Sequence, residues 1–220
     1  MMPDLARFID HTLLKPEATA ADVHRLLAEA AEHGFASVCL PPAWVPLAVE
    51  ELAGTPVAVG TVVAFPFGYV RPDVRLYESR RAIEDGAMEL DTVLNVSLLK
   101  SGEDLRVLGE IASWVESCRF VRSGMVLKVI LETALLTEDE KIRGTQLVVR
   151  SGADFVKTST GFAGGGATVE DVELLARTAE GKIAVKASGG IRDAATARAM
   201  IAAGATRLGT SSGVKILAEG

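Results

Sequence analysis

The chain has 220 residues, 49% of them hydrophobic and 24% charged, which is normal for a globular protein with a sizeable core. Its 23 basic and 29 acidic residues give a net charge of −6, which argues against a nucleic-acid partner, because such proteins normally present a basic face. No segment approaches the ~20 apolar residues of a membrane span, and two cysteines are too few for a disulfide framework. We therefore expect one cytoplasmic domain over residues 1–220, with no membrane partner.

Short apolar segments alternate with longer amphipathic segments along the whole chain. The segment 57–65 is almost continuously apolar, as is typical of parallel strands that are buried on both faces. This pattern predicts strands at 8–13, 37–41, 57–65, 89–95, 126–131, 154–158, 183–187 and 206–209.

Between the predicted strands, apolar residues recur at helical spacing. In the segments 23–31 and 105–115 they return every three or four positions, which predicts one buried face on each helix. Leu105 is the first residue of the second buried face. Thr137 followed by Glu140 forms a capping box, which predicts the start of a third helix.

Eight strands separated by helices favour a (β/α)8 barrel, or TIM barrel. About 250 residues is typical of this fold and roughly 200 is its lower range, so the chain fits one barrel with short loops. A doubly wound open sheet is the alternative within the same α/β class. Functional residues of a barrel lie at the C-terminal ends of its strands, so polar residues near those ends are the candidates.

Three lysines fall inside predicted strands, where lysine is rarely buried without a partner: Lys128, Lys157 and Lys186. One interpretation is structural, with each amine paired to a strand carboxylate or extended toward solvent. The other is a Schiff-base enzyme, because a second ammonium and burial together release a neutral, nucleophilic amine. Adjacent parallel strands lie ~4.8 Å apart, so Lys157 and Lys186, on consecutive strands, are close enough for such coupling.

Several other polar residues accompany these lysines. Asp91 suits a general acid/base, although a counter-ion for a lysine is the simpler role. Asp10 and Thr12 on the first strand are expected to support Asp91 and the lysines through hydrogen bonds, without contacting the substrate. Cys39 ends a strand, and a buried filler is favoured over a reactive thiol. The histidines and cysteines lack metal-ligand spacing, so we expect neither a metal nor another cofactor.

Small and hydroxylated residues follow the last two predicted strands. Gly189 and Gly190 follow the seventh strand, and Gly209, Ser211 and Ser212 follow or end the eighth. TIM barrels often bind phosphate at this place, through the loops after strands 7 and 8 and a short helix N-terminus. Glycines let backbone N–H groups approach the anion, and serines add donors. The sequence therefore predicts a phosphate site here.

Taken together, these segments resemble the deoxyribose-phosphate aldolases, which are metal-free Schiff-base enzymes with a TIM barrel. The resemblance extends over essentially the whole chain. It is carried by IDHTLLKP at 9–16, ELD at 89–91 with Val93 and Asn95, LKVILET at 127–133, FVKTSTGF at 155–162, VKA and GIR at 185–192, and RLGTSS at 207–212.

The resemblance implies reversible cleavage of 2-deoxy-D-ribose 5-phosphate to D-glyceraldehyde 3-phosphate and acetaldehyde. It makes Lys157 the Schiff-base nucleophile, Lys186 the group that lowers the pKa of Lys157 and assists proton transfer, and Asp91 the proton donor and acceptor. Asp10, Thr12 and Lys128 become supporting residues. The resemblance also implies a phosphosugar substrate, with the predicted phosphate site holding its phosphate, and a homodimer or homotetramer.

The chain departs from the family pattern at three places. Phe162 stands where some members have a lysine near the phosphate, with Arg192 as a weak replacement, and Met88 stands where many have an acid. The sequence stops at Gly220, without the tyrosine-bearing tail of longer members. Two other functions stay open: a different Schiff-base barrel acting on a ketose donor, and a phosphosugar-binding barrel without activity.

Overall fold

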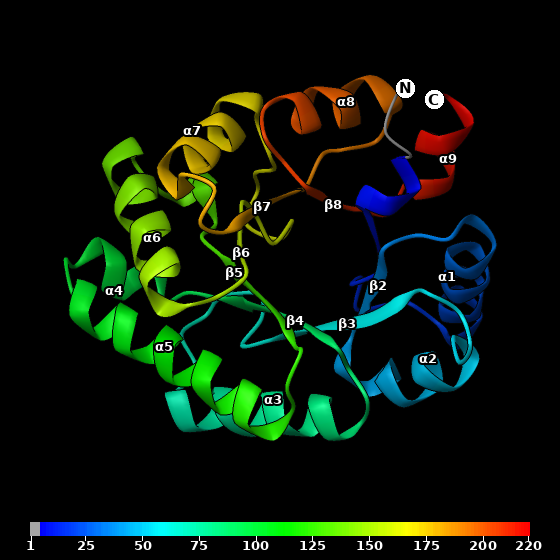
Figure 1. Cartoon of the computed structure of the whole chain (residues 1–220), viewed down its shortest axis with the longest axis horizontal. Helices are drawn as coiled ribbons and strands as arrows, with labels where there is room; N and C mark the ends of the chain where they lie inside the picture. Colours follow the sequence, from blue (N-terminus) through cyan, green and yellow to red (C-terminus); the bar gives the residue numbers. More distant parts are fainter. Residues whose placement is uncertain (1–4) are drawn as a thin grey trace.

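The computed structural model describes residues 5–220, in which eight parallel strands close into a barrel inside a ring of helices (Figure 1). Each strand pairs with its neighbour in chain order, and β1 pairs with both β2 and β8. This closure confirms the predicted (β/α)8 barrel over the open sheet. The strands are β1 Ile9–Thr12, β2 Ser37–Leu40, β3 Ala58–Val63, β4 Glu89–Val93, β5 Val126–Ile130, β6 Phe155–Lys157, β7 Ala184–Ser188 and β8 Arg207–Thr210.

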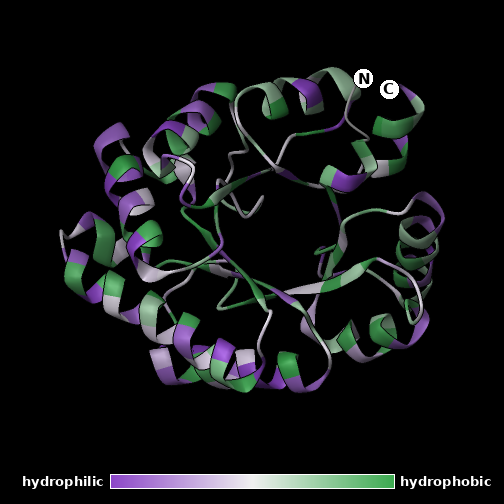
Figure 2. Ribbon diagram, in the orientation of Figure 1, coloured by the Kyte–Doolittle hydropathy of each residue, from purple (hydrophilic) through white to green (hydrophobic). Residues whose placement is uncertain are grey.

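Several helices begin at a residue whose side chain caps the helix N-terminus. The predicted capping box of Thr137 and Glu140 is present at the start of α6, and Thr19 with Asp22 forms another at α1. Figure 2 shows hydrophobic and hydrophilic residues alternating along these helices. The α-helices are α1 Ala20–His33, α2 Val45–Glu51, α3 Pro72–Glu84, α4 Val96–Lys100, α5 Asp104–Val121, α6 Glu138–Ser151, α7 Val169–Ala179, α8 Ala194–Ala202 and α9 Gly213–Ala218. The 3-10 helices are η1 Leu5–Phe8, η2 Pro42–Trp44 and η3 Thr133–Leu135.

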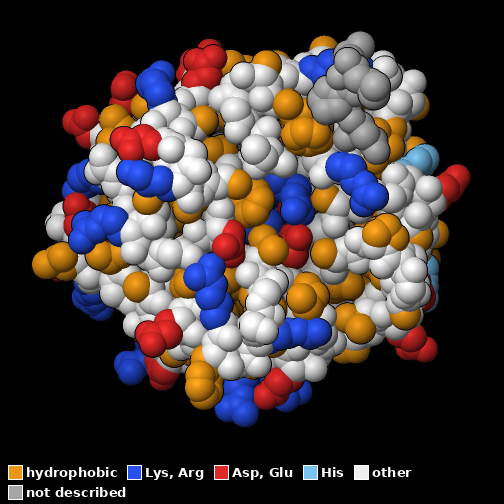
Figure 3. All heavy atoms as spheres, in the orientation of Figure 1, with side chains coloured by type: hydrophobic (Ala, Val, Ile, Leu, Met, Phe, Trp, Pro, Cys, Tyr) orange, Lys and Arg blue, Asp and Glu red, His pale blue; other side chains and the backbone are white. Residues whose placement is uncertain are grey.

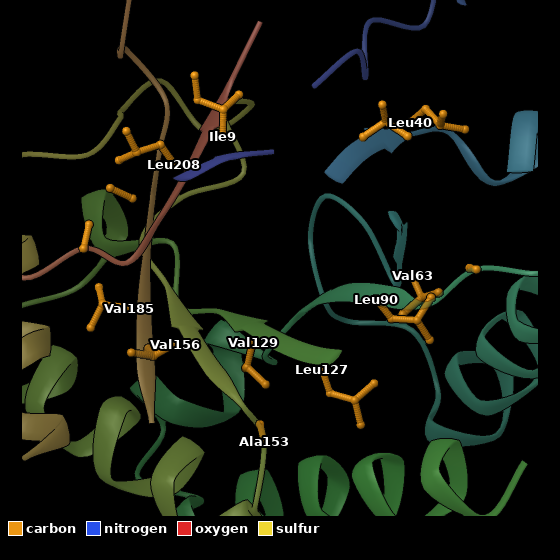
Figure 4. Packing of buried hydrophobic residues seen from close by; sticks show 14 of the residues in the cluster. Ile9, Leu40, Val63, Leu90, Leu127, Val129, Ala153, Val156, Val185 and Leu208 are labelled. Atoms are coloured by element: carbon orange, nitrogen blue, oxygen red, sulfur yellow. The ribbon is translucent and has the colours of Figure 1, made fainter. Parts of the chain in front are cut away.

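The main core lies between the strands and the helices. Successive strand residues point to opposite faces, so alternate side chains face the helices. Leu90, Leu127, Val129, Val156 and Val185 belong to this buried layer (Figure 4). Fully burying side chains of this size stabilises the fold by about 1.5–3 kcal/mol each. The other strand positions face the barrel axis, where the predicted site residues lie.

The buried face of α5 differs from the prediction. Leu105 is 81% exposed, so placing it on the buried face was wrong. Because α5 begins at Asp104, Leu105 lies in its first turn, and the buried face starts at Val107 instead. It continues through Ile111, Trp114, Val115 and Cys118. The Trp114 Nε1–H donates to the Ser79 Oγ at 2.8 Å, which fixes α5 against α3.

Charged side chains occupy the barrel interior. On the face shown in Figure 3, acidic and basic side chains gather around the barrel axis. The strand register places Asp91 beside Lys128 and Lys157 beside Lys186. Within residues 5–220, no helix is long and apolar enough to cross a membrane.

Candidate active site

Lys157, Lys186 and Asp91 meet inside the barrel and together form what we call the mouth cluster. The Nζ atoms of Lys157 and Lys186 donate to the same oxygen, Asp91 Oδ2, at 2.7 and 2.8 Å. The exposure of each residue is 3% or less. The three residues predicted to do the chemistry therefore share one hydrogen-bonded group.

Deeper in the barrel, Asp10, Glu89, Lys128 and Arg207 form a second group, the floor cluster. Lys128 Nζ lies 2.5 Å from Glu89 Oε2, 3.0 Å from Asp91 Oδ1 and 3.7 Å from Asp10 Oδ2. Arg207 Nη1 donates to Asp10 Oδ1 at 2.5 Å and to the Glu89 carboxylate at 3.2 Å. Lys128 thus has the structural role that the first interpretation of the strand lysines described.

The two lysines of the mouth cluster differ in their pKa. Burial lowers the pKa of Lys157, and the Lys186 ammonium lowers it further, while Asp91 opposes both. Burial would also lower the pKa of Lys186, but Asp10 and Asp91 outweigh it and raise that pKa. Lys157 is therefore the amine that loses its proton more easily.

Lys128 and Asp91 keep their charges. Burial alone would lower the pKa of Lys128, but Asp91, Glu89 and Asp10 raise it above its ordinary value. Burial also works against the Asp91 carboxylate, yet Lys128, Lys157 and Lys186 hold its pKa well below the ordinary range. Asp91 is thus an anion at neutral pH.

The first strand supports the network in two different ways. Asp10 pairs with Lys186 Nζ through Oδ2, and its Oδ1 accepts a hydrogen bond from the Ser37 hydroxyl at 2.7 Å. Thr12 donates to the backbone carbonyl of Asp10 at 2.8 Å rather than to a charged side chain. Asp10 therefore belongs to the charged network, whereas Thr12 contacts it only through the backbone.

A cavity of about 310 Å³ lies beside the mouth cluster. Lys157 lines it, whereas Asp91 and Lys186 are not among its lining residues and lie behind the nucleophile. Four of the five residues predicted for phosphate binding line the cavity: Gly189, Gly190, Gly209 and Ser211. Ser212 does not, and its backbone N–H donates to the Thr210 hydroxyl at 2.9 Å.

Two basic side chains also line the cavity. Lys15, from the loop after β1, and Arg192, from the loop after β7, both line it. Within residues 5–220, neither has a carboxylate partner, so their charges are available to an anion. The sequence reasoning missed Lys15, although it lies in the quoted segment 9–16. Phe162 lines the cavity as well, and its ring contacts Phe65 edge-on, with centroids 5.4 Å apart.

Cys39 is only 2% exposed and lies in β2 beside Thr12 and Gly60. Burial, together with the nearby Asp91 charge, raises the pKa of the thiol to about 11. A neutral thiol is a poor nucleophile, which supports the interpretation as a buried filler. Among residues 5–220, no three His, Cys, Asp or Glu side chains are grouped to hold a metal ion.

Comparison with known proteins shows the family of the chain. Residues 5–219 match the model of the DeoC/LacD family of aldolases. The chain belongs to this family. It is 52% identical over 217 residues to the deoxyribose-phosphate aldolase of Geobacillus sp. (strain WCH70), covering 99% of this chain and 96% of the relative. It is also 52% identical over 213 residues to the deoxyribose-phosphate aldolase of Carboxydothermus hydrogenoformans, covering 97% and 93%.

Solved structures of related aldolases have the same fold. An aldolase named QR15 superimposes with a TM-score of 0.92 at 41% identity, covering 99% of this chain and 96% of that one. The deoxyribose phosphate aldolase from Aeropyrum pernix, described as tetrameric, gives a TM-score of 0.90 at 38% identity, covering 97% and 89%. The chain is therefore an aldolase with the barrel of its relatives.

Proposed function

We propose that this aldolase reversibly cleaves 2-deoxy-D-ribose 5-phosphate to D-glyceraldehyde 3-phosphate and acetaldehyde, through a Schiff base on Lys157, in deoxyribose phosphate breakdown. One observation carries the proposal: a buried amine with a lowered pKa lines a cavity that has free cations at its rim. Relatives about half identical to the chain are named for this substrate, which supports the assignment.

The chemistry begins at Lys157. Its neutral amine attacks the C1 aldehyde of the open-chain sugar, and loss of water leaves an iminium ion. The C2–C3 bond then breaks, and its electron pair moves into the iminium to give an enamine. The C3 hydroxyl loses its proton as C3 becomes the aldehyde carbon of D-glyceraldehyde 3-phosphate. Protonation of the enamine at C2 and hydrolysis release acetaldehyde and restore the amine.

Asp91 and Lys186 transfer protons during the reaction. Asp91 lies behind Lys157 and does not line the cavity, so it receives the C3 hydroxyl proton through a water molecule. Its Oδ2 contacts both lysine amines, which lets it move a proton between the substrate and Lys186. Lys186 also keeps the pKa of Lys157 low by its positive charge.

The substrate phosphate lies at the other end of the cavity. Gly189 and Gly190 have no side chain to keep it from the backbone, and Ser211 offers a hydroxyl. Lys15 and Arg192 supply the positive charge that Phe162 cannot. These two basic side chains make the cavity locally positive. The site can therefore hold an anion although the whole chain is acidic.

The proposal also covers the cellular location and the oligomeric state of the enzyme. A cytoplasmic location suits an enzyme acting on a phosphosugar. A homodimer or homotetramer is supported by the Aeropyrum pernix relative, which is described as tetrameric.

Borohydride trapping tests the proposal. With acetaldehyde and borohydride, we expect a reduced adduct on Lys157, located by mass spectrometry of the digested protein. An enzyme for ketose donors would instead trap dihydroxyacetone phosphate, and a phosphosugar-binding protein would trap neither compound. Lys182 is an exposed lysine and serves as the internal control for nonspecific modification, which should be far less extensive than that of Lys157.

A further inference from the structure

The loop after β6 forms one wall of the cavity. It begins at Thr158, directly after Lys157, and it supplies Thr160, Gly161 and Phe162 to the lining. A loop in this position sets how far the nucleophile lies from the phosphate end. The contacts that hold it in place therefore bear on substrate binding.

Glu132, two residues after the end of β5, is the main contact of this loop. Its exposure is 2%, and both carboxylate oxygens accept the Thr160 backbone N–H, at 3.3 and 3.2 Å. Oε2 also accepts a hydrogen bond from the Thr160 hydroxyl. Within residues 5–220, no basic side chain lies within 4 Å of this carboxylate. Because a buried carboxylate is costly without partners, the hydrogen bonds to Thr160 are its compensation.

The backbone at this point favours the same contact. Glu132 has φ 60° and ψ 64°, a left-handed conformation that residues other than glycine rarely adopt. This conformation turns the chain directly after β5. The next residue, Thr133, donates its N–H to the Thr158 carbonyl at 2.9 Å. Two successive residues therefore bind the start of the wall.

The contact continues along the loop toward the phosphate end. The Thr160 hydroxyl oxygen accepts the Phe162 N–H at 3.0 Å, so the position of Phe162 depends on Thr160. Farther along, the Ala167 N–H donates to the Gly189 carbonyl at 3.0 Å. At Gly166 the loop approaches so closely that an added Cβ would lie 2.6 Å from the Gly189 carbonyl oxygen. The wall is thus held by Glu132 at one end and by Gly189 at the other.

We propose that Glu132 is a positioning residue that fixes this wall through Thr160 and thereby sets the distance between Lys157 and the phosphate end. The proposal rests on the proposed function. Glu132 does not line the cavity, so it acts only through the loop. A substrate that extends from Lys157 to the phosphate end needs the loop after β6 in its correct position. Acetaldehyde is small and contacts only the end of the cavity near Lys157. Binding of the phosphosugar therefore reports the position of the loop, and trapping of acetaldehyde reports the reactivity of Lys157.

The test compares Glu132→Gln with wild type. The amide has the same shape, but it loses one acceptor oxygen and the negative charge that strengthens the hydrogen bonds from Thr160. We expect the KM for 2-deoxy-D-ribose 5-phosphate to rise about tenfold, the scale of one charge-assisted hydrogen bond. The rate of acetaldehyde trapping on Lys157 should stay within about twofold. Glu138→Gln, an equal charge change at an exposed position, is the matched control and should change neither value.

A second pair of variants checks the route through Thr160. Thr160→Val removes the hydroxyl and should reproduce the raised KM, whereas Thr160→Ser keeps the hydroxyl and should restore wild-type behaviour. An unchanged KM in folded Glu132→Gln overturns the proposal, and so does an equal loss of cleavage and trapping. If Glu132→Gln does not fold, Thr160→Val decides by the same criteria. A wild-type protein that traps no acetaldehyde refutes the proposed function instead, which keeps the two failures distinct.

Discussion

The floor cluster and the mouth cluster both combine buried lysines with carboxylates, yet the pKa shifts of Lys128 and Lys157 are opposite. Lys128 in the floor has three carboxylates within 4 Å, whereas Lys157 in the mouth has one. The pKa of Lys128 is raised, and that of Lys157 is lowered. Both side chains are almost fully buried. The difference therefore comes from the number of neighbouring carboxylates.

Magnitudes support this explanation. Two unit charges 4 Å apart interact by about 4 kcal/mol at an effective dielectric constant of 20. One carboxylate offsets only part of the burial cost of an ammonium, and for Lys157 the nearby Lys186 charge acts against it. Three carboxylates exceed that cost. A barrel interior can thus hold a permanent cation and a reactive amine on neighbouring strands.

The largest effect is expected from Lys157→Leu. Among residues 5–220, this change removes the only amine that both lines the cavity and has a lowered pKa. Cleavage activity should fall by about 10⁴-fold or more, as it does when a nucleophile is removed. Stability should change little, because Asp91 keeps Lys128 and Lys186 as partners. Steady-state kinetics and thermal melting measure the two effects.

Retention of wild-type activity in that variant would exclude Lys157 as the nucleophile. Lys182→Leu, at an exposed site, is the matched control and should retain full activity.

The next effect is on stability and concerns the floor. Lys128→Met removes the partner of Glu89, Asp91 and Asp10 and leaves a buried excess of negative charge. Breaking such a buried pair costs about 3–5 kcal/mol of unfolding free energy, which urea denaturation would measure. A loss no larger than that of Lys157→Leu would mean that the two clusters do not differ in the way we describe.

Lys186→Leu tests the charge coupling within the mouth. The Lys186 ammonium lowers the pKa of Lys157, so its removal should raise that pKa. The neutral amine would then form only at higher pH, and the acid limb of the pH–rate profile should move upward. At pH 7 we expect the rate to fall by roughly 100-fold or more, which includes the lost proton transfer. The profile of kcat/KM against pH gives the result, and an unmoved acid limb contradicts the coupling.

Much of the fold could be predicted because its signals are local. Continuous apolar segments and capping residues gave the eight strands and the start of α6. The same segments placed Lys157 and Lys186 on consecutive predicted strands, close enough to couple. Leu105 was placed wrongly because helical spacing alone does not fix where a buried face begins. Only packing against α3 and α6 determines this.

The division between floor and mouth could not be predicted, because it depends on residues far apart in the sequence. Asp10 and Arg207 are separated by 197 residues, and they meet only when the barrel closes. The three strand lysines look alike in the sequence, and only the carboxylates across the strands distinguish them. Glu132 and Thr160 are likewise 28 residues apart. Lys15 was not predicted because it follows the first strand, whereas a phosphate site was expected after strands 7 and 8.

The smallest effect is expected at Cys39, which lies near the mouth cluster. Its thiol has a pKa of about 11, so it is neutral at pH 7 and adds no charge near Lys157. Cys39→Ala should therefore leave the pH–rate profile unchanged and cost only about 1 kcal/mol of stability for the small cavity. A thiolate would act differently, because a second anion would raise the pKa of Lys157. If the variant moved the acid limb to lower pH, the mouth cluster would lie beside two anions, Asp91 and a Cys39 thiolate. The number of carboxylates alone would then not explain why the pKa shifts of Lys157 and Lys128 differ.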